Sequence, residues 1–145
     1  MRGFSQPITE NVTLCRGEEK ITFVVHPQPV GYYPWLRGVF PPPVIYEGRA
    51  GGGTTTSPDT TRTEEYEDLF AFVLIAKCLE AGTMVSQEPE GRATRAQWHE
   101  YAVALRDEFR AAGFTSGEVR KLLHTATAVT QSVTVDKAEE RRGNS

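Results

Sequence analysis

The longest apolar run of the chain covers residues 64–80 and reads EEYEDLFAFVLIAKCLE. Its acidic side chains come first and Lys77 comes near the end, which is the charge order that a helix dipole favours. The apolar positions would cover most of the circumference of a helix, and such a helix is normally buried by its neighbours. The run is too short and too acidic at one end to cross a bilayer. We therefore predict a central helix over residues 63–81.

Two amphipathic helices are predicted after the central run. Residues 94–97 (TRAQ) and 115–118 (TSGE) have the pattern of capping boxes, in which a threonine and a glutamine or glutamate close the first turn of a helix. Apolar residues then recur at the three- and four-residue spacing of one helix face. We predict helices over 95–112 and 116–130, whose apolar faces carry Trp98, Tyr101, Leu105 and Phe109 in the first and Val119, Leu122, Leu123 and Val129 in the second.

The front of the chain has the alternating pattern of strands. Residues 20–25 (KITFVV) are rich in β-branched side chains and place Ile21, Phe23 and Val25 on one face. Residues 12–15 alternate more weakly, and the segment RGEE between the two runs supplies a turn. We predict a hairpin whose apolar face needs a cover, because a lone two-stranded hairpin is only marginally stable in water. The central helix is the predicted cover.

A segment rich in proline and aromatic residues follows over 30–43 (VGYYPWLRGVFPPP). Its first proline favours a short helical turn over 34–37, and the three prolines at its end force an extended backbone. Two interpretations of the rings remain open: packing against the hairpin or the central helix, or an exposed docking surface, since aromatic residues are enriched at interfaces. On the second interpretation, the candidate partner-binding residues are Tyr32, Tyr33, Trp35, Leu36 and Phe40.

Glycine, threonine and serine dominate residues 49–62 (RAGGGTTTSPDTTR), which predicts a flexible linker, because these side chains bury too little surface to offset the entropy lost on ordering. The glycines do not form a phosphate-binding loop, because no lysine follows at the required spacing. The polar residues 132–145 predict a disordered tail. The predicted fold class is α+β: a small N-terminal β-hairpin region over 1–48, the linker, a helical region of about three helices over 63–131, and the tail.

Composition narrows the classes of partner. The chain has 145 residues, 39% of them hydrophobic, and a formal net charge of −3. This charge gives no electrostatic case for binding nucleic acid or a membrane surface. The first residues lack the apolar core of a signal peptide, and Cys15 and Cys78 lie far apart. We therefore expect a cytosolic protein with two buried, reduced thiols.

No constellation of residues in the sequence points to catalysis. His26, His99 and His124 stand in unrelated contexts, and neither cysteine belongs to a CxxC pair. Hydrolase, metalloprotease and nucleotide-binding motifs are missing from the sequence. The basic residues of the rear helices alternate with acidic ones, which indicates a mixed solvated surface. We expect no metal and no cofactor, and we interpret the chain as a small non-enzymatic binding or assembly protein.

The parts follow one another in a distinctive order. A hairpin leads into a PxPxxxYxxLR-like pattern, an FPPP element over 40–43, a flexible linker, and a helical region that includes VLIAKCLE and ALRDEFRAAGFTSGEVRKL. Over most of residues 12–130 this order resembles the tail assembly chaperones of long-tailed bacteriophages and related prophages. The residues that match the first pattern are Pro27, Pro29, Tyr33, Leu36 and Arg37.

The resemblance implies a function without catalysis or cofactors. A protein of this family binds the tape-measure protein in the host cytoplasm, keeps this long helical protein soluble before the tail tube polymerises, and recruits tail tube subunits. The resemblance leaves self-association and a frameshifted longer form open. The alternative from another class is a structural subunit that stays in the virion, such as a connector or minor tail protein.

Overall fold

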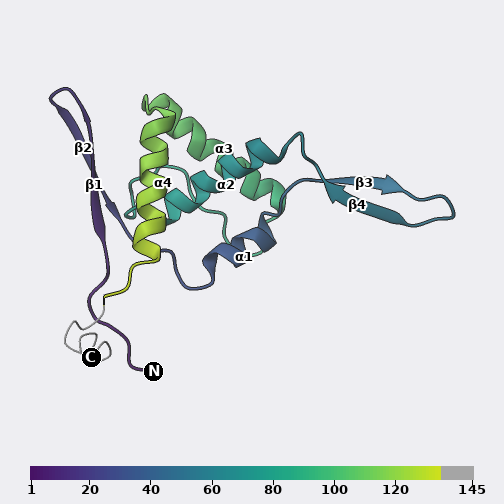
Figure 1. The fold of residues 1–145 in the computed structure, drawn as a ribbon, viewed down its shortest axis with the longest axis horizontal. Coiled ribbons are helices and arrows are strands. Elements are labelled where there is room, and N and C mark those ends of the chain that lie inside the picture. The colour runs from purple at the N-terminus through teal and green to yellow at the C-terminus, as the bar shows by residue number, and fades with distance from the viewer. Residues whose placement is uncertain (135–145) are drawn as a thin grey trace, which may run out of the picture.

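The computed structural model describes residues 1–134, in the order β1 (Glu10–Arg16), β2 (Glu19–Val25), α1 (Tyr32–Val39), β3 (Val44–Gly48), β4 (Thr54–Pro58), α2 (Thr63–Cys78), α3 (Arg95–Ala111) and α4 (Ser116–Thr130). The long helices α2, α3 and α4 form the body of the molecule (Figure 1). One hairpin flanks this body and the other extends away from it. The α+β fold class is confirmed, with α1 as a helix beyond the three predicted.

Helix α2 is the centre of the body. Its side chains contribute to both hydrophobic clusters of the core, one shared with α1 and α3 and the other mainly with α4 and the β1–β2 hairpin. The helix ends at Cys78 rather than at residue 81, because Leu79 adopts an extended conformation and pairs with Val25 in an isolated antiparallel bridge. The N–H of His26 also donates to the carbonyl of Cys78 (2.6 Å), so the end of α2 is tied to the end of β2.

Both predicted capping boxes, 94–97 and 115–118, are present with their reciprocal hydrogen bonds. Helix α3 ends at Ala111, and Gly113, just after the C-cap, has a φ of 80°, a left-handed conformation. The N–H of Phe114 then bonds to the carbonyl of Phe109 (3.0 Å), as in a Schellman motif. This turn reverses the chain so that α4 begins beside the end of α3.

The predicted N-terminal hairpin is confirmed. Strands β1 and β2 pair antiparallel, with Val12 opposite Phe23 and Leu14 opposite Ile21, so the four apolar side chains share one face. Helix α4 contacts both strands. The cover of this face is therefore mainly α4, and the central helix contributes only its C-terminal end.

The segment 49–62, predicted as a flexible linker, contains a strand instead. Strand β4 pairs antiparallel with β3, with Tyr46 opposite Thr56. Threonine is β-branched and favours extended backbone, and glycines 51–53 take the positive φ values of a tight loop. The linker prediction was based on the small apolar surface that the glycine, threonine and serine residues of this segment can bury. The strands are indeed almost wholly exposed, but their backbone groups pair with each other.

Helix α4 ends at Thr130, close to the predicted end of the helical region. Most of the predicted disordered tail, residues 135–145, lies outside the described part of the chain. Among residues 1–134, no helix combines the length and the hydropathy that a membrane crossing needs.

Candidate functional site

The aromatic segment that the sequence identifies as a candidate partner-binding surface forms α1. Gly31 before it has a φ of 79°, a left-handed conformation that glycine adopts without strain. Pro34 lies in the first turn, where a backbone N–H has no partner within the helix, so its ring costs no hydrogen bond. The N–H of Phe40 closes the helix by donating to the carbonyl of Leu36 (2.7 Å). The predicted turn over 34–37 is thus part of a helix of eight residues.

The structure divides the five candidate residues into a buried and an exposed set. Tyr32, Leu36 and Phe40 are 7%, 0% and 0% exposed and belong to the core shared with α2 and α3. Tyr33 and Trp35 are 44% and 49% exposed. Three of the five candidate residues are therefore closed to a partner in this structure, and only Tyr33 and Trp35 remain as candidates. The buried three are four positions apart, a spacing that places them on one helix face and marks them in the sequence as core residues.

The two exposed rings are held in place by rings of the body. The Trp35 ring packs edge-to-face on Trp98 and at a tilt against Tyr32, with 5.7 Å between centroids in both pairs. The Tyr33 ring packs edge-on against Phe70 at 5.3 Å. Because these contacts fix the rings before any partner arrives, binding through them would cost little side-chain entropy.

Arg37 fastens α1 to α2. Its guanidinium carbon lies 3.9 Å from the ring centroid of Phe70, and its terminal nitrogens donate to the two carboxylate oxygens of Glu67 (3.1 and 3.2 Å). The same nitrogens donate to the hydroxyl groups of Tyr33 (2.7 Å) and Tyr66 (3.2 Å). Arg37 therefore has a structural role, which is to orient Tyr33 and to hold α1 in position.

Tyr32 joins α1 to the loop before α3. Its hydroxyl group donates to Glu88 (3.2 Å), which also pairs with Lys77 of α2 (3.2 Å). Burial, and after it the charge of Glu88, raises the pKa of Tyr32 well above its ordinary value. The phenol consequently stays protonated and acts as a hydrogen-bond donor that anchors the loop.

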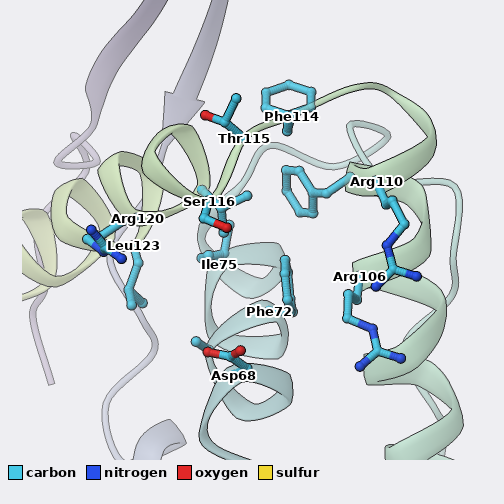
Figure 2. A pocket seen from close by; sticks show the side chains of 13 residues that line it. Asp68, Phe72, Ile75, Arg106, Arg110, Phe114, Thr115, Ser116, Arg120 and Leu123 are labelled. Carbon is cyan, nitrogen blue, oxygen red and sulfur yellow. The ribbon is translucent and has the colours of Figure 1, made fainter. Parts of the chain in front are cut away.

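A second surface, which we call the arginine groove, lies between α2, the end of α3 and the start of α4. Its volume is about 420 Å³, and Figure 2 shows the side chains that line it. The apolar lining comes from all three helices and from the loop between α3 and α4: Ala71, Phe72, Ile75, Phe109, Phe114, Val119 and Leu123. Arg106, Arg110, Arg120 and Asp68 supply the charged lining.

The arginines gather where the sequence indicates only a mixed solvated surface. Arg106 and Arg110 project from α3 on one side of the groove, and Arg120 projects from α4 on the other (Figure 2). The four-residue spacing predicts that the first two share a face of α3. The position of Arg120 depends on the chain reversal at Gly113, which sequence spacing does not reveal. The Nε atom of Arg106 is buried without a hydrogen-bond partner in the described part of the chain.

The two thiols have different environments. Cys78 is buried, and burial raises the pKa of its thiol to about 11. Cys15 is exposed, which corrects the expectation of two buried thiols. It pairs with Lys20 on the face of the β1–β2 hairpin opposite to Leu14 and Ile21. Within residues 1–134, no three or more histidine, cysteine, aspartate and glutamate side chains gather as they would around a metal ion.

Comparison with known proteins gave no match among protein-family models, curated proteins or solved structures.

Proposed function

We propose that this protein is a non-enzymatic binding protein that holds an apolar helical partner on the exposed side of α1. The resemblance to tail assembly chaperones supplies the partner: the tape-measure protein of a long-tailed phage, bound in the host cytoplasm before the tail tube subunits polymerise. The observation that carries the proposal is Trp35, whose ring is 49% exposed on a helix that is fixed in the core on its other side.

Trp35 has the properties of an interface anchor. Tryptophan and tyrosine contribute disproportionately to binding energy, because they bury a large area with few rotatable bonds. Tyr33 adds a second half-exposed ring, and Val30, just before the helix, is fully exposed. A long helical partner would present apolar stripes again and again along its length. Many copies of the protein can then bind along one partner and cover its apolar stripes.

The test is co-expression with the candidate tape-measure protein, followed by co-purification. The wild-type protein should keep the partner soluble and bound. Trp35→Ala should retain about a tenth of the partner or less, because truncating an interface anchor weakens the binding free energy by on the order of 2 kcal/mol. Tyr46→Ala is the matched control: it also removes an exposed aromatic ring, 71% exposed on β3, and should retain the partner as the wild type does.

Trp35 also contacts Trp98, so the melting temperature of each variant must be measured with its binding. A Trp35→Ala variant that keeps the wild-type melting temperature and the wild-type amount of partner would show that Trp35 is not the anchor. A wild-type protein that does not bind the partner would contradict the chaperone proposal itself.

The second candidate function is a structural subunit of the virion. The β3–β4 hairpin favours it, because an arm with two open strand edges is suited to joining a neighbouring subunit. The two functions predict different compositions of the finished particle. A chaperone should be missing from purified virions, whereas a connector or minor tail protein should be present in fixed proportion to the other tail proteins.

A further inference from the structure

The arginine groove and α1 lie on opposite faces of α2. Tyr66 and Phe70 of α2 pack against Phe40, with centroids 5.1 and 6.4 Å apart. Asp68 and Phe72 each lie two residues further along, which is roughly 200° around the helix, and both line the groove. A molecule in the groove would therefore leave the surface of α1 free.

The apolar lining of the groove is incompletely covered by the protein itself. Ile75 and Phe109 are 1% and 4% exposed, but Phe72, Phe114 and Leu123 are only partly buried. These three side chains come from α2, from the loop after α3 and from α4, and all three line the groove (Figure 2). A groove of apolar side chains between two helices is the kind of surface on which an amphipathic helix docks.

The walls of the groove are basic, although the net charge of the chain is −3. Arg120 makes no ion pair within residues 1–134. Arg106 faces Glu65 at 3.6 Å and Arg110 faces Asp107 at 3.7 Å, and the two carboxylate side chains are 60% and 58% exposed. Exposed pairs of this length contribute little to stability. The carboxylates of a partner can therefore take the place of Glu65 and Asp107 beside these arginines.

We infer that the arginine groove binds an amphipathic helix of a partner protein, one with carboxylates on both flanks of its apolar stripe. The apolar stripe covers Phe72 and Leu123. Carboxylates on one flank pair with Arg106 and Arg110, and those on the other flank pair with Arg120. The inference goes beyond the proposed function, because the groove is a separate surface that different variants test.

A protein helix fits the groove better than a small molecule does. Small-molecule sites usually enclose most of their ligand, whereas this groove is open at its walls: the Arg110 side chain is 71% exposed and Arg120 is also exposed. The other occupant to consider is a second copy of the chain. It would make the protein dimerise in the absence of any partner.

The experiment uses three short, fluorescently labelled helical peptides and the full-length protein. The first peptide has leucines at alternating spacings of three and four residues, flanked by glutamates on both sides. The second has lysine in place of every glutamate, and the third has serine in place of every leucine. Fluorescence anisotropy at low and at high salt should show binding of the first peptide only, with an affinity that falls as salt rises.

Two charge-reversal variants locate the binding site. Arg120→Glu should weaken binding of the first peptide by roughly tenfold, because it places a carboxylate against the carboxylates of the peptide. Lys121→Glu is the matched control. It makes the same change of charge at the next exposed residue of α4, outside the groove lining, and should leave binding within about twofold of the wild type. Arg120 is exposed near the start of α4, where a carboxylate suits the helix dipole, so its variant should fold.

Several results would overturn the inference. Equal binding of the lysine peptide, no binding of the glutamate peptide, or equal effects of Arg120→Glu and Lys121→Glu would each exclude the proposed occupant. Displacement of the glutamate peptide by laurate at a comparable concentration would identify the groove as a site for small amphiphiles. A dimer of the free protein that Arg120→Glu dissociates would identify the occupant as a second copy. None of these results tests Trp35, so the proposed function and this inference are tested independently.

Discussion

The two hairpins of this protein share an architecture but differ in their relation to the body. In the β1–β2 hairpin, Val12 and Val25 are 5% and 1% exposed and pack with the C-terminal end of α2 and with α4. In the β3–β4 hairpin, no residue of either strand is buried, and the strands extend away from the helices (Figure 1). A two-stranded hairpin alone is marginal in water. The first hairpin thus gains stability from the helices, and the second depends on its own backbone pairing.

The projecting hairpin is nevertheless fixed at its base. The N–H of Asp59 donates to the carbonyl of Pro43 (3.0 Å), and the hydroxyl group of Thr61 donates to the carboxylate of Asp59 (2.7 Å). Asp59 is 8% exposed, so the point where the arm leaves the body is well packed even though the arm is not. Anchoring and burial are therefore separate in this protein: the body fixes where the β3–β4 hairpin begins and leaves its surface exposed.

The largest expected difference between the hairpins is in their response to truncation. Val25→Ala should lower the free energy of unfolding by about 2 kcal/mol, because it removes two buried methyl groups and leaves a cavity. Ile45→Ala, at a side chain that is 42% exposed on β3, should change it by less than about 0.5 kcal/mol. Urea denaturation followed by circular dichroism measures both values.

Equal losses of unfolding free energy in Val25→Ala and Ile45→Ala would show that the two hairpins do not differ in how they pack on the body. A large loss in Ile45→Ala would mean that the β3–β4 hairpin packs against something in solution, such as a second copy of the chain. Sedimentation of the same samples at several concentrations would then distinguish a dimer from a rearranged monomer.

The pattern of apolar residues in the sequence predicts the β1–β2 hairpin but not the β3–β4 hairpin, for a physical reason. Alternation of apolar and polar residues arises when one face of a strand is buried, as it is toward the end of β2, where Phe23 is partly buried and Val25 is buried. The strand Thr54–Pro58 has no buried face and so no alternation. Its pairing depends on β-branched threonines and on a glycine loop, and in the sequence these resemble a linker. The capping boxes and the central helix were predictable because they are local, apart from the end of α2, which the bridge from Val25 sets.

The candidate surfaces were only partly predictable from the sequence. The sequence identifies the aromatic segment, but the helix formed there turns Tyr32, Leu36 and Phe40 into the core and leaves Tyr33 and Trp35 outside. The arginine groove could not be predicted, because it brings together residues from three helices. Its geometry depends on how α3 and α4 pack on α2, and periodicity within one helix carries no information about that packing.

The two hairpins should also differ, by a smaller amount, in how their contacts make the stability of the protein depend on pH. Arg16 of β1 donates to Glu118 of α4 and to the carbonyl of Gly113 (2.5 Å). The hydrogen bond from Arg16, and after it the N–H of Thr115, lowers the pKa of Glu118 from 4.5 to about 2. A carboxyl group whose pKa is lower in the folded state stabilises the fold fully above its unfolded pKa, and this contribution is lost as the pH falls toward the folded pKa.

Glu118→Gln should therefore lower the urea midpoint at neutral pH, and the difference from the wild type should shrink as the pH falls from about 5 toward about 2. Glutamine can still complete the capping box, so the helix cap is preserved. Glu47→Gln is the control, because it makes the same change on the projecting hairpin and should shift the midpoint little at any pH. A Glu118→Gln effect that does not depend on pH would exclude the ion pair as its cause.

The central claim is that Trp35 contacts the helical partner while the core beneath it stays unchanged. The two tryptophans make this directly measurable, because Trp35 is 49% exposed and Trp98 is 2% exposed. Fluorotryptophan incorporated into this protein alone gives two fluorine resonances, which a Trp35→Phe sample assigns. On addition of the unlabelled candidate tape-measure protein, the Trp35 resonance should shift and the Trp98 resonance should shift much less. A complex that forms while the Trp35 resonance stays in place would show that Trp35 does not contact the partner.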